Sequence, residues 1–378
     1  MSMTVSRWLS VASPSSNAGT RGATGSNGRA AVMTALGDIV VAAAAFWICG
    51  RLGGAPFAPD DATAILRAVA LLSGILLILG FYRVDLRRSY ERFRLRALGV
   101  MLFVLAQLIA GPLVEDAFGT AARVIAAGVL FLIFGFWCEQ WLMRGMAGAD
   151  AEKPAAASRA LAGGERPGSR SMPVYACIKR ASDIALGLLM LIASAPVVAL
   201  AALLIKRADP GPAFYAQTRI GAHGRAIAVL KLRTMYRDAD ARLQDLLESD
   251  PEARAEWNRF FKLRHDPRVL PRIGHILRRT SIDELPQLWN VIRGSMSLVG
   301  PRPFPAYHMQ AFDQAFQQIR TSVPPGLTGL WQISERSEGD LHTQRLHDLS
   351  YIARRSLLFD LYILLATVPA VALGRGAR

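Results

Sequence analysis

The stretch Lys179–Arg207, KRASDIALGLLMLIASAPVVALAALLIKR, decides how this chain relates to a membrane. Its uncharged run Ile184–Ile205 reaches the roughly 20 apolar residues that a membrane-spanning helix needs. Basic pairs flank the run at both ends, and clustered lysine and arginine mark the cytoplasmic side of a membrane. We therefore expect both ends on the cytoplasmic side, with a re-entrant helix over 179–207.

A proline in the middle of this run indicates where the helix turns back. Pro196 removes an amide donor and its ring clashes with the preceding turn, so it can bend a helix. Ser194 and Pro196 mark the predicted break between the two halves. The alternative is a fifth spanning helix with an ordinary proline kink, which would place the charged C-terminal part outside the cell.

Four apolar runs of about spanning length precede this stretch: 33–50, 62–82, 97–114 and 121–143. The loop between the second and third runs, RVDLRRSYERFRLR (83–96), is rich in arginine, whereas the other two loops hold few basic residues. The positive-inside rule then predicts a four-helix transmembrane bundle over 33–145, with this loop in the cytoplasm. A soluble helical bundle is the alternative.

The rest of the chain divides by composition. Residues 1–32 and 146–172 are rich in small and polar residues and predict a disordered tail and a flexible linker. Residues 173–378 form the remaining domain, in which PAFYAQTRIG and AIAVLKLRTM flank AHGR and predict a β-hairpin. Helices are expected near 238–264 and 304–320, and an interfacial helix over 356–373. The fold class is thus a membrane protein carrying a small α/β cytoplasmic domain.

Charge and cysteine usage narrow the function classes. Lysine and arginine number 44 against 29 acidic residues, a formal net charge of +15. The chain lacks a zinc finger, an RNA-recognition motif and aromatic–basic interleaving, so we expect no nucleic-acid partner. Anionic membrane lipid is the expected partner of the charge beside the apolar runs. Three widely spaced cysteines predict neither a disulfide framework nor a zinc site, and the phosphate-binding loops of ATP and NAD proteins are absent.

Two adjacent carboxylates stand among arginines in RRTSIDELPQLWNVIRGSMSLVGPRP (278–303). Ser281 and Glu284 have capping-box spacing, and Asp283 as the N-cap would tolerate Pro286, so both carboxylates could simply begin a helix. The alternative is catalysis, because a carboxylate ionised by nearby guanidinium groups can attack phosphorus, and a second one can bind magnesium. Arg278 and Arg302 are suited to bidentate phosphate contacts.

These blocks, with the re-entrant stretch, LKLRTM and VPPGLTGLWQIS, resemble the bacterial polyprenyl-phosphate sugar-1-phosphate transferases, over about 175–373. The type is the undecaprenyl-phosphate glucose or galactose phosphotransferase of the monotopic phosphoglycosyl transferase superfamily, in its long form with four N-terminal membrane helices. The resemblance implies transfer of a hexose-1-phosphate from a UDP-sugar, glucose first and galactose second, to undecaprenyl phosphate. UMP is released through a covalent aspartyl-phosphosugar, and the step initiates exopolysaccharide, capsule or O-antigen synthesis.

The resemblance also assigns roles to residues. Asp283 matches the nucleophile and works with Glu284 and Mg²⁺ or Mn²⁺. The positions matched to substrate phosphate or nucleotide are Lys231, Arg233, Arg278, Arg302, Gln217 and Arg219. It implies a multi-pass protein of the bacterial inner membrane, with a homodimer and later glycosyltransferases as further partners. A non-catalytic scaffold that recruits those glycosyltransferases is the alternative function.

Three departures from the family stand in this chain. Only the linker 146–172 occupies the place of a Rossmann-like domain, which puts any regulatory or oligomerising role of that domain in doubt. Ala195 separates Ser194 from Pro196, and Glu335 stands where glycine is common, which bears on substrate choice or loop shape.

Overall fold

A computed structural model describes the chain over residues 23–51, 59–83, 89–110, 117–146, 173–260, 263, 266–334 and 341–372. It forms two compact units, Met1–Gly148 and Ala149–Arg378. The predicted linker and most of the predicted tail fall outside the described residues, as does Glu335.

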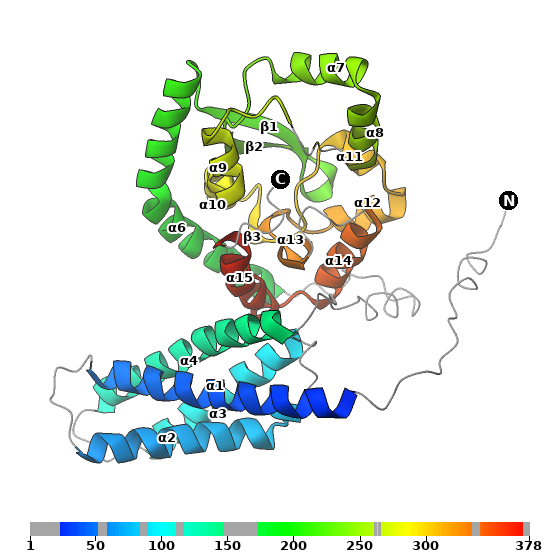
Figure 1. Ribbon diagram of the computed structural model, residues 1–378. Helices are drawn as coiled ribbons and strands as arrows, with labels where there is room; N and C mark the ends of the chain where they lie inside the picture. The colour runs from blue at the N-terminus through cyan, green and yellow to red at the C-terminus, as the bar shows by residue number, and fades with distance from the viewer. Residues whose placement is uncertain are drawn as a thin grey trace, which may run out of the picture. The chain divides into compact units, whose positions relative to one another are not determined.

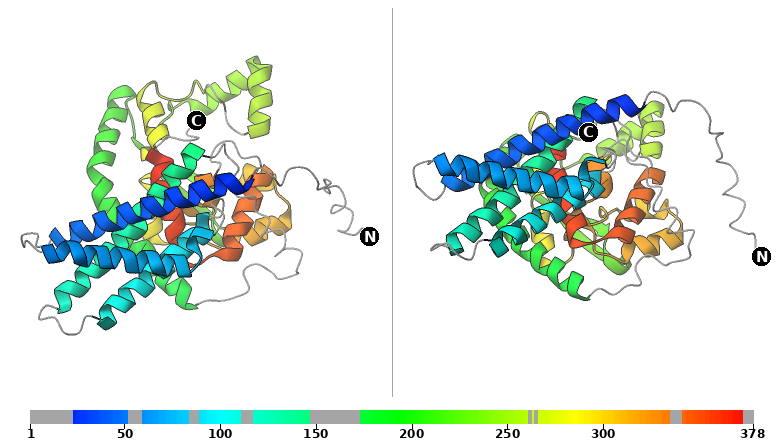
Figure 2. Two further views of the ribbon diagram at one scale, coloured as in Figure 1. Left: turned by 60° about the horizontal axis from the view of Figure 1, so that its bottom comes forward. Right: turned by 90° about the horizontal axis from the view of Figure 1, so that it is seen from below.

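The first unit is a bundle of four helices, and its core lies between them. The helices are α1 (Ala23–Arg51), α2 (Pro59–Ile78), α3 (Ser89–Ala110) and α4 (Ala117–Met146), with the short helix η2 (Phe81–Arg83) after α2. Each helix packs on the next, and α1 also packs on α4; α1 and α2 run side by side in each view of Figure 2. The core is built from small, aliphatic and aromatic side chains such as Ala42, Leu72 and Phe103. α1 begins at Ala23, so it includes part of the segment that we expected in the tail.

Three of the described helical segments are long and apolar enough to cross a membrane: Val32–Cys49, Ala121–Gln140 and Val174–Ala208. The apolar part of α2, Ala62–Ile78, is shorter. The expected third span falls in α3, which forms but opens with SYERFRLR and so begins with charged residues. This pattern is that of a membrane protein.

Two buried arginines and two buried carboxylates meet inside the bundle. Arg96 Nη2 lies 2.8 Å from Asp38 Oδ1, and Arg96 Nη1 lies 3.0 Å from Glu139 Oε2. Arg92 pairs with Glu139 through its Nε. The charges balance, which explains how Asp38 is accommodated within an apolar helix, since charges in such segments are costly unless paired.

The second unit is built on the long helix α6 (Pro173–Ala208) and a β-hairpin. Strands β1 (Phe214–Ile220) and β2 (Ala226–Leu232) pair in antiparallel fashion around the short turn η3 (Ala222–Gly224), which confirms the predicted hairpin. Figure 1 shows α6 changing direction part-way along its length. The helix nevertheless runs on through Pro196, so the expected break is a bend within one helix and not an interruption between two.

Short helices and a second small sheet complete this unit. The helices are α7 (Ala239–Ser249), α8 (Pro251–Phe260), α9 (Ile273–Thr280), η4 (Ile282–Glu284), α10 (Gln287–Arg293), α11 (Ala306–Gln310), α12 (Gln314–Thr321), α13 (Leu330–Ser334), α14 (Leu341–Arg354) and α15 (Leu357–Ala372). Strands β3 (Ser297–Val299) and β4 (Gly326–Thr328) are parallel. Both expected helical stretches are divided in two, at Pro251 and at Asp313, whose side chain caps α12.

Both halves of α6 pack on this one domain. In its first half, Gly187 lies against α10, where an added Cβ would be 3.5 Å from Val291. Near its end, Ala201 and Ile205 join a buried cluster with Leu232 of β2. The helix is therefore held by the small domain at two places along its length.

Candidate active site

A tight turn between two helices carries the two carboxylates. Ser281 closes α9 in a left-handed conformation (φ 56°), with its N–H donating back to α9 carbonyls. The turn η4 follows, and α10 has Pro286 as its N-cap; neither Ser281 nor Pro286 makes a side-chain capping bond. The expected capping bond of Ser281 is therefore not formed, because Ser281 ends α9 with its backbone; both carboxylates nevertheless stand in the turn η4, which Ser281 precedes.

Glu284 is held by two cations from different elements. Lys231 Nζ, on β2, donates to Glu284 Oε1 at 2.9 Å. Arg302, after β3, donates to both carboxylate oxygens, with Nη2–Oε1 2.5 Å and Nη1–Oε2 3.2 Å. Burial alone would raise the pKa of the Glu284 carboxyl, but Arg302 and Lys231 outweigh burial and hold it well below its ordinary value. Glu284 is thus a fixed anion.

Asp283 lies in the opposite environment although it is the adjacent residue. Its side chain is 8% exposed. Burial and the negative charge of Glu284 raise the pKa of the Asp283 carboxyl to about 6, against the weaker opposing effects of Lys231, Arg278 and Arg302. A carboxylate that is desolvated and ionised near neutral pH is poised to react, whereas its neighbour is committed to ion pairs.

The β-hairpin brings four side chains to the same face beside this pair. Tyr215 is directly opposite Lys231 in the register, and Gln217 and Arg219 follow at every second residue of β1. Burial raises the pKa of the Tyr215 hydroxyl. Four nearby charged groups also affect this pKa: Arg278, Asp283, Arg219 and Glu284. Tyr215 was not among the predicted site residues, although it alternates along the strand with Gln217 and Arg219, which were.

Arg219 and Gln217 form a small polar group of their own. Arg219 Nη2 donates to Gln217 Oε1. Burial and the nearby Arg302 lower the pKa of the Arg219 guanidinium, which therefore lies close to the cation that holds Glu284. Both predicted residues lie on the face of the hairpin that carries Lys231.

Two other predicted cations have protein partners of their own. Arg278 Nε donates to Thr234 Oγ1 at 3.0 Å, while its charge acts on Asp283. Arg233 is buried and pairs with Asp209 just beyond α6, so the structure places it beside the membrane helix and not on the carboxylates. Ser194 donates to the Leu191 carbonyl within α6, 3.2 Å away.

The residues present fit a divalent metal only with help from a substrate. In the described part of the chain, no three metal-ligating side chains come together. Asp283 and Glu284 supply hard oxygen atoms, and magnesium is commonly held by one or two carboxylates plus substrate phosphates.

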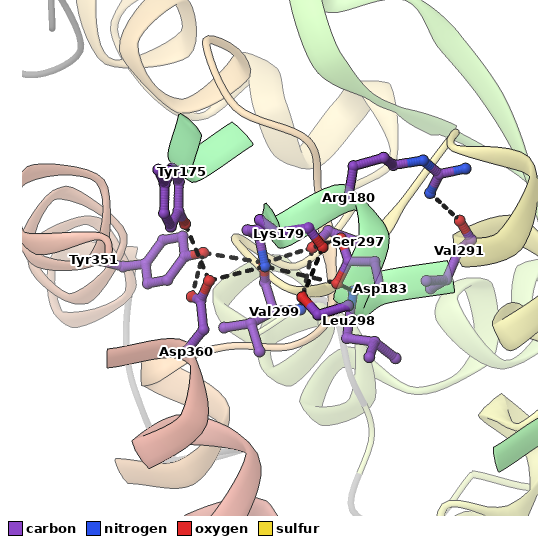
Figure 3. Close-up of polar contacts among 11 residues, drawn as sticks. Tyr175, Lys179, Arg180, Asp183, Val291, Ser297, Leu298, Val299, Tyr351 and Asp360 are labelled. Atoms are coloured by element: carbon purple, nitrogen blue, oxygen red, sulfur yellow. Dashed lines mark hydrogen bonds and ion pairs between the residues drawn. The ribbon is translucent and has the colours of Figure 1, made fainter. Parts of the chain in front are cut away.

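A buried polar network ties the first turns of α6 to the strand that leads to Arg302 (Figure 3). Asp183 accepts from Ser297 Oγ at 2.8 Å and from the Leu298 N–H at 3.1 Å. Lys179 Nζ lies 3.0 Å from Asp360 Oδ2 and 3.7 Å from Asp183 Oδ1, so it links the two carboxylates. Helix α6 is thereby joined to β3 by hydrogen bonds and to α15 by an ion pair.

Two tyrosines complete this network, and both hydroxyls point at Asp360 in Figure 3. Tyr175 and Tyr351 donate to its two oxygens at 3.0 and 2.9 Å. Arg180 extends the anchorage to α10, donating to the carbonyls of Val291 and Ile292 at 2.6 Å each. α6 therefore contacts both the helix that follows the carboxylates and the strand that precedes Arg302.

Comparison with known proteins places this site in a family. A family model described as bacterial sugar transferase matches residues 174–374. The chain belongs to the bacterial sugar transferase family. The match contains the whole candidate site, whereas the helical bundle before it lies outside. The resemblance inferred from the sequence is confirmed, and the chain is an enzyme of the sugar transferase type.

Curated relatives match the same region. The exopolysaccharide production protein ExoY of Sinorhizobium fredii is 44% identical over 205 residues, 54% of this chain and 90% of that protein. The undecaprenyl-phosphate galactose phosphotransferase of Salmonella typhimurium is 39% identical over 200 residues, 53% of this chain and 41% of that protein. The UDP-glucose:undecaprenyl-phosphate glucose-1-phosphate transferase of Caulobacter vibrioides is 42% identical over 201 residues, which are 51% of this chain and 69% of that protein.

Proposed function

We propose that this enzyme transfers a hexose-1-phosphate from a UDP-sugar to undecaprenyl phosphate and releases UMP, as the first step of an exopolysaccharide, capsule or O-antigen repeat unit. The names of the relatives support a lipid carrier and a sugar donor of this kind. UDP-glucose is the first candidate donor and UDP-galactose the second.

The observation that carries the proposal is the contrast between Asp283 and Glu284. Asp283 is buried, and its pKa of about 6 makes it an anion at neutral pH, whereas Glu284 is held in ion pairs with Lys231 and Arg302. Its carboxylate oxygen forms a bond to the β-phosphorus, and the bond from that phosphorus to the UMP oxygen breaks. A phosphate oxygen of the lipid carrier then attacks the same phosphorus, and the aspartyl carboxylate is regenerated.

The surrounding cations suit the charge that this exchange must manage. Lys231 and Arg302 donate hydrogen bonds to Glu284. The charge of Arg278 acts on Asp283, and Arg219 lies close to Arg302. Guanidinium groups aimed at phosphate oxygens offset the repulsion between the entering carboxylate and a diphosphate. Mg²⁺ or Mn²⁺, held by Asp283, Glu284 and the diphosphate, would neutralise the remaining charge.

The packing of α6 supports a re-entrant helix with the catalytic domain in the cytoplasm. A helix that crosses a hydrocarbon layer of about 30 Å puts its ends on opposite faces. Here both the Asp183 end and the Ile205 end contact one small domain. The four bundle helices would then span the bacterial inner membrane, with anionic lipid near their basic loops.

The experiment is a UMP-release assay with purified protein, undecaprenyl phosphate, magnesium and a panel of UDP-sugars. We expect turnover with one donor, and with donor alone no more than about one UMP per enzyme, with a phosphosugar on the peptide that contains Asp283. The matched control, Asp283→Asn, should release none. Release of UDP in place of UMP, or continued release without the lipid, would contradict the proposal.

A further inference from the structure

A buried arginine that no sequence motif singled out lies behind Arg302. Arg320, on α12, is 4% exposed. Its Nε donates to Asp348 Oδ2 on α14 at 2.7 Å, and its Nη2 donates to the backbone carbonyl of Arg302. The guanidinium carbon lies 3.9 Å from the centre of the Phe304 ring. A third, weaker bond runs from Nη1 to Met309 Sδ at 3.3 Å. Three hydrogen bonds and a ring therefore fix both the position and the plane of this group.

The carbonyl that Arg320 holds belongs to the segment that grips Glu284. In GPRP (300–303), prolines on both sides of Arg302 restrict the backbone. The Pro301 carbonyl accepts from the Gly326 N–H at 2.8 Å, and the Phe304 carbonyl accepts from the Ile220 N–H at 2.8 Å. Arg320 adds a tie between these two anchors, at the residue whose side chain makes two bonds to Glu284.

We propose that Arg320, oriented by Asp348, is a positioning residue for sugar-phosphate transfer, because it fixes the backbone of Arg302 so that both bonds to Glu284 form. The inference rests on the proposed function of the carboxylate pair. A tie between α12 and α14 would need only the bond to Asp348, and buried ion pairs are weak stabilisers compared with apolar side chains. Holding a second acceptor in the same plane requires the arginine fork.

The test compares two conservative substitutions in the same pair of helices. Arg320→Lys keeps a cation beside Asp348 but cannot hold both acceptors with one planar group. The control, Arg345→Lys, changes an arginine of α14 that pairs with Asp313 at the start of α12, where both side chains are well exposed (40% and 46%). Amide exchange at Gly326, kcat for UMP release and KM for the UDP-sugar are measured in full-length protein.

We expect Arg320→Lys to speed exchange at Gly326 and to lower kcat by about tenfold to a hundredfold, since small displacements of catalytic groups cost that much. The loss should fall mainly on kcat and much less on KM, because Arg320 touches only the backbone of Arg302 and the bonds to Glu284 depend on where that backbone lies. Arg345→Lys should leave all three measurements unchanged.

Faster exchange confined to α12 and α14, with kcat falling only as much as the folded fraction, would overturn the proposal. If Arg320→Lys does not fold, Asp348→Asn replaces it, since asparagine keeps the shape and weakens the orienting charge. The same criteria for amide exchange, kcat and KM apply. If the wild type releases no UMP, the proposed function fails, and exchange at Gly326 alone decides whether Arg320 fixes this segment.

Discussion

At the scale of single residues, Asp283 and Glu284 show how one peptide bond can separate opposite electrostatic environments. Lys231 and Arg302 converge on Glu284, while Asp283 is buried against the resulting anion. Two carboxylates this close divide their roles, since one charge disfavours the other. The structure therefore distinguishes a carboxylate held in ion pairs from a buried one whose pKa lies near 6.

The first prediction separates catalysis from helix capping. Asparagine caps helices about as well as aspartate, so a capping role would make Asp283→Asn harmless. We expect UMP release to fall by about a thousandfold or more, as when a nucleophile is removed from other enzymes. The measurement is turnover of purified variant with thermal unfolding as the check on its fold. Turnover near that of wild type in folded protein would remove Asp283 as the nucleophile.

The second prediction concerns stability, where the two carboxylates should act with opposite sign. The folded pKa of Asp283, about 6, exceeds its unfolded value of 3.8, so its ionisation opposes folding as pH rises through that window. Asp283→Asn should then stabilise the protein at pH 7.5 by roughly 2–3 kcal/mol and have little effect near pH 4.

Glu284→Gln is the matched comparison. The folded pKa of Glu284 is lowered, so its ionised form contributes stability above the unfolded value of 4.5, and that contribution is lost as pH falls. The amide would also leave Lys231 and Arg302 without their anion, so this variant should be less stable at pH 7.5. Thermal unfolding in EDTA checks both variants. Equal destabilisation by the two would contradict the assignment.

Sequence motifs anticipated much of this site and missed what depends on tertiary contacts. Lys231 and Arg302 were predicted to lie near the two carboxylates, and both donate hydrogen bonds to Glu284. Arg233 lies two residues from Lys231 yet pairs with Asp209, because the strand ends between them and a buried partner is available. Arg320 carries no local signal at all, since its role comes from a carbonyl 18 residues away.

At the scale of elements, α6 is an anchor as well as a membrane helix. Arg180 donates to two carbonyls in the last turn of α10, where helical N–H partners run out; the Val291 carbonyl also accepts from the Gly294 N–H at 3.0 Å. Gly294, the C-cap of α10, adopts a positive φ of 88°, and a Cβ there would lie 3.1 Å from Arg180 Nη2. The contact is therefore fitted closely on both sides.

The third prediction tests this anchor. Arg180→Gln should lose at least one of two charge-assisted bonds and destabilise the second unit by about 1.5–3 kcal/mol. Arg225→Gln, in the exposed hairpin turn, is the control and should leave stability within about 0.5 kcal/mol of wild type. Chemical unfolding followed by tryptophan fluorescence measures both. An Arg180 variant as stable as the control would show that the two bonds to α10 do not contribute to holding α6.

Elements were predictable where the pattern is local. The hairpin follows from two β-leaning stretches around a turn, and it forms as expected. The parallel pair β3 and β4 joins segments far apart in the chain, where the backbones approach so closely that a Cβ on Gly326 would lie 2.0 Å from Gly300 N. The sequence around each glycine does not indicate that the two backbones meet. Because the strands are short and the segments look apolar or loop-like, this sheet could not be predicted.

At the scale of the whole molecule, the bundle and the candidate active site belong to different compact units, and each unit contains a helix long and apolar enough to cross a membrane. The family match begins at residue 174, so the bundle of α1 to α4 is an addition to a catalytic unit that relatives such as ExoY match over most of their length. Apolar run length alone predicted the bundle, but it could not show that Arg92 and Arg96 are paired inside it with Asp38 and Glu139. Charge balance in the core depends on how the helices are packed.

The last prediction decides the topology of α6, on which access to cytoplasmic UDP-sugars depends. In a chain with alanine at Cys49, Cys138 and Cys177, single cysteines are introduced at Ser158, before α6, and at Gln244, after it. Because both ends of α6 contact one domain, we expect both positions to resist a membrane-impermeant thiol reagent in intact cells and to react after permeabilisation.

A cysteine at Asp60, in the first turn of α2, is the positive control, because this end of α2 should face outward if the arginine-rich loop after it faces the cytoplasm. Labelling of Gln244→Cys but not of Ser158→Cys in intact cells would mean that α6 crosses the membrane. The domain would then lie on the side without nucleotide sugars, and the contacts of both helix ends with it could not form together. Protection of both positions, with Asp60→Cys labelled, leaves a helix that enters and leaves by the same face, with Asp283 beside the cytoplasmic surface where a lipid phosphate and a soluble nucleotide sugar can meet.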